Sequence, residues 1–103
     1  MPESDTEKTV EAYRRFLGVI KTLRSENGCP WDREQTPLSM RGDLIEETFE
    51  AVDAITSEDS VHAKEELGDV LLNDTMISYM YEQKGDWKIS DSINELSDKL
   101  IRR

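Results

Sequence analysis

The sequence predicts an all-α protein, and two observations carry this prediction. Apolar side chains recur every three or four residues along four separate segments, which is the period of one face of a helix. Nowhere do apolar and polar residues alternate with a period of two for long enough to indicate a strand. We therefore expect a four-helix arrangement in one domain that spans residues 1–103.

The first expected helix carries its apolar stripe over residues 10–23. Asp5 or Thr6 would cap its N-terminus, and the Asn-Gly pair at 27–28 would end it. Residues 29–35 show no periodicity, so we expect them to form a loop.

The second expected helix begins at Thr36, an N-cap residue that is followed by Pro37 at the first helical position. Its apolar stripe runs over residues 38–55. Residues 56–60 then form a turn, in which Ser60 would cap the next helix.

The third expected helix has its apolar stripe over residues 61–81, and Gly85 suits the left-handed position after its last turn. Ser90 or Asp91 would cap a fourth helix. The apolar stripe of that helix covers residues 93–101.

The composition describes a small acidic chain. Its 103 residues include 13 Lys and Arg against 23 Asp and Glu, which gives a formal net charge of −10. This balance argues against a nucleic-acid binder or a protein of anionic membranes, because phosphate groups favour Lys and Arg. Only 36% of the residues are hydrophobic, so the core of one copy is modest. Association with further copies would bury more apolar surface.

Cys29 is the only cysteine, which excludes a disulfide or a cysteine zinc site within one chain. No stretch approaches about 18 consecutive apolar residues, and the first five residues lack the basic and apolar regions of a signal peptide. We therefore expect a cytoplasmic protein without a membrane span.

Two pairs of acids stand out on the second and third expected helices. Glu47 and Glu50 are three residues apart, so they lie on one face of their helix, about 60° from each other. Glu66 and Asp69 repeat this spacing. The intervening residues 51–65 suffice to finish one helix, turn and begin an antiparallel one, so the two pairs can face each other.

Helical wheels place Glu47 and Glu66 at the border of the apolar faces, where carboxylates lose hydration and repel one another. Such a cluster requires cations or protons. All-oxygen ligands select hard divalent ions, so Mg²⁺ or Mn²⁺ is favoured over zinc. The spacing alone leaves a second interpretation open, because acids of this spacing are also common on solvated helix faces.

These motifs resemble the signature of the MazG family of nucleoside triphosphate pyrophosphohydrolases. The family pattern is Glu-Glu-x-x-Glu, a spacer and Glu-x-x-Asp, which stands here at residues 46–50 and 66–69. The similarity extends to the Cys-Pro-Trp-Asp segment at 29–32 and to the basic end at 99–103. It covers most of the chain, from about residue 12 onward.

The resemblance implies an all-α enzyme that assembles as a dimer or tetramer. Its activity would be hydrolysis of a nucleoside triphosphate between the α and β phosphates. By position, four acids would be the ligands of Mg²⁺, for which Mn²⁺ is the expected substitute: Glu47, Glu50, Glu66 and Asp69. Glu46 would be an outer catalytic acid that orients the water.

Several side chains are candidates for substrate binding. Four of the basic ones are Lys64, Lys99, Arg102 and Arg103. The last three match the family's basic nucleotide-contacting stretch, although the dipole of a helix C-terminus also favours such a run. Trp31 would stack on a nucleobase or cover the end of the bundle. Arg33 would contact a base or a phosphate, or merely solvate its loop.

Two further residues leave alternatives open. His62 lies one helical turn before Glu66, so it either touches the site or is a lone surface histidine. Asp74 stands where relatives carry an apolar residue. It would be a further acid of the metal site, a contact to a partner chain or a protonated buried group.

Two other functions compete with hydrolysis. A non-catalytic acidic helical bundle that binds nucleotide or a partner protein also fits the composition. A di-iron carboxylate bundle requires Glu-x-x-His pairs on two helices, whereas the only histidine here, His62, precedes its nearest acid partner.

Overall fold

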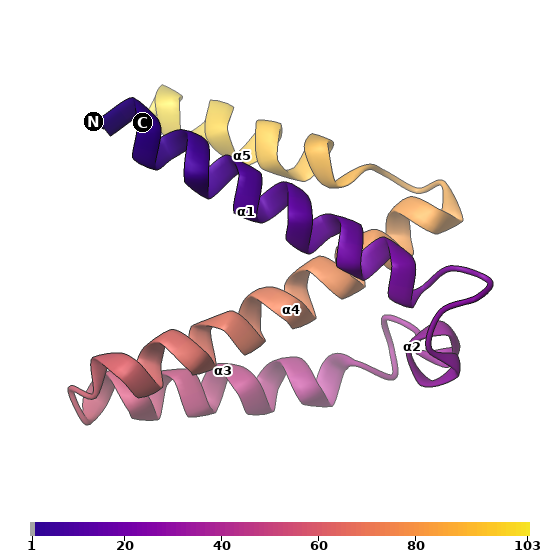
Figure 1. Cartoon of the computed structure of the whole chain (residues 1–103), viewed down its shortest axis with the longest axis horizontal. Coiled ribbons are helices and arrows are strands. Elements are labelled where there is room, and N and C mark those ends of the chain that lie inside the picture. The colour runs from indigo at the N-terminus through magenta and orange to yellow at the C-terminus, as the bar shows by residue number, and fades with distance from the viewer. Residues whose placement is uncertain (1) are drawn as a thin grey trace. The chain divides into compact units, whose positions relative to one another are not determined.

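The computed structural model describes the backbone of residues 2–103 and the side chains of residues 4–103. These residues contain five helices and no strand (Figure 1). The all-α prediction is therefore confirmed. The chain forms two compact units, Met1–Gln35 and Thr36–Arg103. The helices are α1 (Pro2–Leu23), α2 (Pro30–Glu34), α3 (Arg41–Thr56), α4 (Ser60–Lys84) and α5 (Ile89–Arg102).

The start of α1 lies before both predicted caps. Pro2 is the first residue of the helix, so Asp5 and Thr6 lie within it and neither is the N-cap. Proline suits the first turn of a helix, because its φ is already helical and an N–H there would have no acceptor in the helix. The Thr9 hydroxyl donates to the Asp5 carbonyl at 3.0 Å, a bond typical of a helix interior.

The end of α1 is a tight turn that requires glycine. The helix ends at Leu23, earlier than the predicted Asn-Gly stop. The Gly28 N–H then donates to the Ser25 carbonyl at 2.9 Å. A Cβ atom at Gly28 would lie 2.3 Å from the Thr22 carbonyl oxygen and 2.4 Å from that of Leu23. Such distances are far below van der Waals contact, so a side chain at this position would force the turn open.

The segment that was expected to form a loop contains the short helix α2. Periodicity cannot reveal it because five residues span little more than one turn. Pro30 occupies its start. An Nη1 atom of Arg24 donates to the carbonyls of Asp32 and Gln35 at 2.5 and 2.9 Å, which gives partners to carbonyl groups at the end of α2.

A reciprocal cap opens the second unit. Thr36 Oγ1 accepts from the Ser39 N–H at 3.1 Å, and Ser39 Oγ accepts from the Thr36 N–H at 2.8 Å. These bonds stabilise a turn at residues 37–40, after which α3 begins at Arg41. Thr36 therefore caps this turn and not α3, whose N-cap is Met40, so the predicted helix start at Thr36 and Pro37 is wrong.

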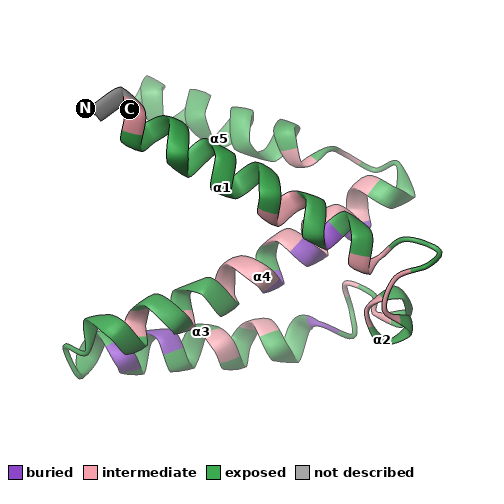
Figure 2. Cartoon of the chain, in the orientation of Figure 1, coloured by how far each residue is buried: buried purple, intermediate pink, exposed green. Residues whose placement is uncertain are grey.

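Helices α3 and α4 pack against each other in antiparallel directions (Figure 1). Ala51 and Ala54 on α3 are 3% and 1% exposed (Figure 2). Small buried side chains allow two helix axes to approach closely. This close pairing positions the acids described below.

The turn between α3 and α4 is short and capped by an aspartate. Glu58 adopts a left-handed backbone conformation with φ of 57°. The Asp59 side chain then accepts from the His62 N–H at 3.1 Å and is the N-cap of α4. The prediction of Ser60 as cap is wrong by one residue, because only the Asp59 carboxylate reaches a free N–H of the first turn.

The end of α4 agrees with the prediction, since Gly85 is left-handed with φ of 83°. α5 begins at Ile89, so neither Ser90 nor Asp91 is its N-cap. Asp91 instead reaches back from the first turn, where its carboxylate accepts from the Lys88 N–H at 2.8 Å.

The core is small, and much apolar surface remains exposed. The buried hydrophobic residues among those described are Ile20, Met40, Ala51, Ala54, Met76 and Met80. Phe49 on α3 is 76% exposed, and Ile93 and Leu96 on α5 are more than half exposed. Over the described part of the chain, no helix is long and apolar enough to cross a membrane.

Candidate metal centre

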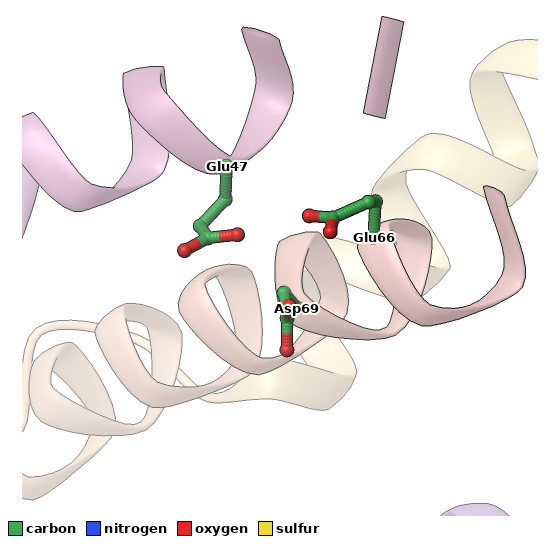
Figure 3. Close-up of side chains that lie close together, drawn as sticks. All are labelled: Glu47, Glu66 and Asp69. Atoms are coloured by element: carbon green, nitrogen blue, oxygen red, sulfur yellow. The ribbon is translucent and has the colours of Figure 1, made fainter. Parts of the chain in front are cut away.

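Three carboxylates converge between α3 and α4 (Figure 3). Glu47 comes from α3, and Glu66 and Asp69 come from α4. Each side chain contributes one carboxylate oxygen, and these three oxygens all lie within 4.8 Å of one another. Glu66 and Asp69 share a helix face because they are three residues apart, and the antiparallel packing of α3 places Glu47 opposite them.

Two of these carboxylates are half-buried and incompletely bonded. The Glu66 side chain is only 13% exposed, and Glu47 is also half-buried, whereas Asp69 is exposed. Oε2 of Glu47 and Oε2 of Glu66 are buried without a hydrogen-bond partner. A buried carboxylate oxygen without a donor is unfavourable, and a cation would supply the missing partner.

The electrostatic surroundings of Glu47 also favour a bound cation. Burial raises the pKa of Glu47 above its ordinary value of 4.5. Four neighbouring carboxylates raise this pKa further, in decreasing order Glu50, Asp69, Glu66 and Glu46. The cluster therefore disfavours its own ionised form, which a bound cation would stabilise.

Glu66 is perturbed in the same direction. Burial raises its pKa, and both the hydrogen bond and the charge of Glu50 add to this effect. His62 acts in the opposite direction through its hydrogen bond and charge. Glu50 is exposed and does not belong to the three converging acids, although its charge raises the pKa of Glu66.

The donor set fits a hard divalent cation. The three converging ligands offer only carboxylate oxygens, which suit Mg²⁺ or Mn²⁺ and leave coordination positions for water and phosphate oxygens. The cluster is thus a candidate site for a divalent metal. Glu46 precedes Glu47 on α3 and is exposed.

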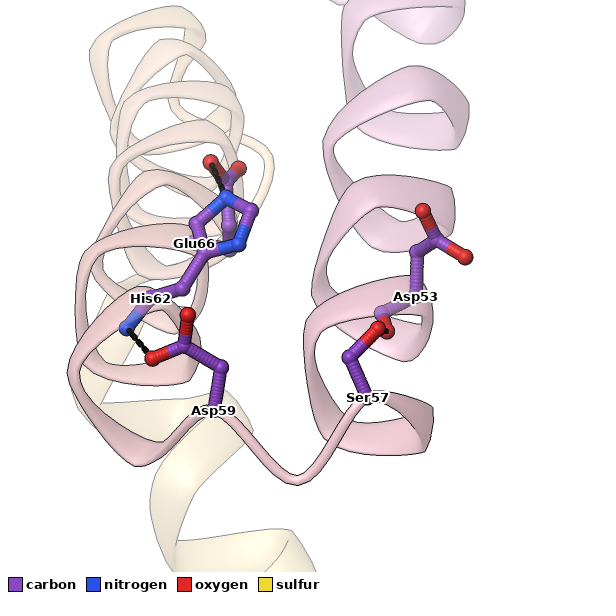
Figure 4. Close-up of polar contacts among 5 residues, drawn as sticks. All are labelled: Asp53, Ser57, Asp59, His62 and Glu66. Carbon is purple, nitrogen blue, oxygen red and sulfur yellow. Dashed lines mark hydrogen bonds and ion pairs between the residues drawn. The ribbon is translucent and has the colours of Figure 1, made fainter.

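The structure decides whether His62 touches the site or is a lone surface histidine. Nε2 of His62 lies 3.2 Å from Oε1 of Glu66, so it touches the acid cluster although its own side chain is half exposed (Figure 4). Asp74 is exposed and accepts from the Ser78 hydroxyl at 3.2 Å. The interpretation of Asp74 as a protonated buried group is therefore wrong.

The candidate substrate contacts lie on α2, on α4 and at the C-terminal end of the chain. Trp31, which is 72% exposed, and Arg33 are on α2. Four exposed basic residues are on α4 and at the C-terminal end of the chain: Lys64, Lys99, Arg102 and Arg103.

Asn73 is a polar neighbour of the site that sequence analysis does not identify. It is 5% exposed, and its Nδ2 donates to the Asp69 carbonyl at 2.9 Å. Its Oδ1 is buried without a partner. The available signal is its position seven residues after Glu66, which places both on one face of α4.

The sequence comparisons bear directly on this site. The family described as "MazG nucleotide pyrophosphohydrolase domain" matches residues 35–103, which is more than half of the chain. The chain belongs to the MazG family. The matched region contains all of α3, α4 and α5, and therefore the three converging acids of this MazG domain.

Individual relatives agree with the family assignment. The "Nucleoside triphosphate pyrophosphohydrolase/pyrophosphatase MazG" of Thermotoga maritima is 41% identical over 91 residues, which cover 88% of this chain and 36% of that protein. The "Nucleoside triphosphate pyrophosphohydrolase" of Escherichia coli K12 is 41% identical over 90 residues, covering 86% and 34%. The "Uncharacterized protein YabN" of Bacillus subtilis is 43% identical over 91 residues, covering 88% and 19%. The chain thus spans between about a fifth and just over a third of the length of these relatives.

Proposed function

We propose that this MazG chain is a Mg²⁺-dependent nucleoside triphosphate pyrophosphohydrolase, for which Mn²⁺ is an alternative ion. The observation that carries this proposal is the convergence of Glu47, Glu66 and Asp69 within 4.8 Å, with buried oxygens that lack partners. The proposal is further supported by the names of two relatives, which describe nucleoside triphosphate pyrophosphohydrolases.

In this proposal, the acids of the α3–α4 seam hold the metal. The ligand set is Glu47, Glu50, Glu66 and Asp69. Divalent metal ions supply Lewis acidity and lower the pKa of bound water. Glu46 orients the attacking water and receives its proton. The oxygen of that water forms a bond to the α phosphorus, the bond to the oxygen that bridges the α and β phosphates breaks, and pyrophosphate leaves with that bridging oxygen.

The basic side chains bind the phosphates and the leaving group. Lys64, Lys99, Arg102 and Arg103 would donate hydrogen bonds to phosphate oxygens and stabilise the charge that develops on pyrophosphate. Trp31 would stack on the nucleobase, and Arg33 would contact the base or a phosphate.

Several properties of the whole protein belong to the same proposal. The MazG domain would extend over residues 1–103, beyond the matched region 35–103. The exposed apolar stripes of α3 and α5 support assembly as a homodimer or tetramer. We also propose a cytoplasmic location, where nucleoside triphosphates are available.

Pyrophosphate release tests the proposed function. The purified chain is incubated with eight ribo- and deoxyribonucleoside triphosphates, each with Mg²⁺ and with a chelator. We expect a nucleoside monophosphate and pyrophosphate from at least one of them, only in the presence of metal. Release of orthophosphate would place the cleavage at the γ phosphate and contradict the proposal. Nucleotide binding without any turnover would favour the non-catalytic bundle.

A further inference from the structure

His62 has a defined place at the edge of the acid cluster. Its ring Nε2 lies 3.2 Å from Oε1 of Glu66, across one turn of α4 (Figure 4). When Glu66 is ionised its carboxylate can only accept, so the contact then requires the His62 tautomer that carries a proton on Nε2. The contact occupies Oε1, whereas Oε2 of Glu66 remains buried without a partner.

The turn before α4 anchors His62. The Asp59 carboxylate accepts from the His62 N–H at 3.1 Å and fixes the first turn of the helix. The Ser57 hydroxyl donates to the Asp53 carbonyl at 3.0 Å and fixes the last turn of α3 on the other side (Figure 4). Hydrogen bonds therefore fix the backbone on both sides of the turn that precedes His62.

Burial differs between the two partners. The Glu66 side chain is 13% exposed and that of His62 is 50% exposed, so the contact joins a half-buried carboxylate to a ring that solvent reaches. A glutamate has three side-chain torsions, and a bond to one oxygen restricts all of them. Outer partners of metal ligands act in this way: they orient the ligand and thereby raise the affinity for the metal.

We propose that His62 is a positioning residue, which holds the Glu66 carboxylate in the orientation that binds the divalent cation. This inference rests on the proposed function, because it presumes that Glu66 is a metal ligand. His62 itself touches neither the metal nor the nucleotide in this proposal. Its contribution appears in metal affinity and not in the chemical step.

The test is calorimetric titration of the metal-free full chain with Mn²⁺ alone, without nucleotide and at one fixed pH of about 8, where free imidazole is neutral. We compare the wild type with His62→Ala and His62→Gln. Val61→Ala is the matched control, because Val61 is an exposed, uncharged neighbour in the same helical turn. Thermal unfolding without metal accompanies each titration.

We expect His62→Ala to weaken Mn²⁺ binding about tenfold, which is the lower end of the effect of outer partners. His62→Gln should recover part of this loss, since its amide can also donate to Glu66. Val61→Ala should bind Mn²⁺ like the wild type. The unfolding midpoints of His62→Ala and Val61→Ala should be similar, which separates positioning from a general loss of stability.

Two results would overturn the inference. Equal Mn²⁺ affinity in the wild type and His62→Ala would do so while leaving the metal site intact, and a raised KM for nucleotide in separate steady-state kinetics would then assign His62 to substrate binding. No saturable Mn²⁺ binding by the wild type would remove the proposed metal site, and with it the inference.

Discussion

The acid cluster between α3 and α4 and the basic end of α5 differ in how the fold holds their side chains. The acids come from two packed helices, and their oxygens approach within 4.8 Å. The basic residues Lys99, Arg102 and Arg103 are all exposed at the C-terminal end of one helix. The fold thus brings together the acids of the candidate metal site. Long, exposed basic side chains are flexible and would acquire a fixed geometry only from a bound anion.

The largest effects should follow from removing an acid of the proposed ligand set. Outer partners of metal sites change affinity by about 10- to 100-fold, so loss of a ligand should reduce turnover at least about a hundredfold. We expect this for Glu66→Gln, with the helix content measured by circular dichroism unchanged. Glu65→Gln is the matched control, because it makes the same chemical change at an exposed neighbour and should retain activity. Turnover of Glu66→Gln close to that of the wild type would contradict the site.

A substitution of Glu50 tests whether the ligand set extends beyond the three converging acids. Glu50 is exposed and lies outside the three converging acids, yet it perturbs both Glu47 and Glu66. We expect Glu50→Gln to abolish turnover while the circular dichroism spectrum stays the same, because the proposed metal coordination loses one ligand. Retained turnover would restrict the ligand set to the three converging acids.

The basic end should show a smaller and different effect. Because Arg102 and Arg103 are proposed to bind phosphate, the double substitution Arg102→Ala and Arg103→Ala should raise the KM for nucleotide about tenfold, as expected for loss of one or two charged hydrogen bonds. Steady-state kinetics measure this change. The affinity for Mn²⁺ in the absence of nucleotide should stay the same. If Mn²⁺ affinity fell in parallel, the acid cluster and the basic end would not be separate regions.

The smallest effect concerns stability without metal. The folded state raises the pKa of Glu47, so it binds protons more tightly than the unfolded state does. This contribution to stability is fully present below about pH 4.5 and is lost as the pH rises through the raised pKa. At neutral pH we therefore expect metal-free Glu47→Gln to unfold a few degrees higher than the wild type.

A series of thermal unfolding curves at increasing pH would measure this difference. The unfolding midpoint of Glu47→Gln should exceed that of the wild type increasingly as the pH rises above 4.5. Added Mg²⁺ should reduce this difference, since metal stabilises only the chain that binds it. Lys99→Ala, at the basic end, should show no such pH-dependent difference. A difference for Glu47→Gln that is constant across the pH range would contradict the role of its ionisation.

The helices were predictable from sequence where burial imposes a period, but apart from the end of α4 at Gly85 their ends were not. Asp59 and Ser60 are adjacent residues that both favour the N-cap, and only the backbone geometry decides that Asp59 bonds to the first turn. Pro2 starts α1 although Asp5 and Thr6 are the better capping residue types. α2 is too short to show a period at all.

The acid cluster was predictable in part, because helix spacing determines which residues share a face. Glu66 and Asp69 lie together on α4 as expected, and the packing of α3 brings Glu47 to them. Spacing alone cannot tell that Glu50 stays exposed at the edge, since this depends on how α3 is rotated against α4. The contact of His62 with Glu66 depends on a side-chain conformation that no sequence pattern specifies.

Hydrolysis in ¹⁸O-labelled water, followed by mass spectrometry of both products, tests the central claim most directly. If the acid cluster holds a metal that directs water to the α phosphorus, the label will appear in the nucleoside monophosphate and not in pyrophosphate. It will appear only with Mg²⁺ present, and Glu66→Gln will not produce it. Label in pyrophosphate, label in released orthophosphate, or labelling that persists with a chelator would contradict the proposed site and reaction.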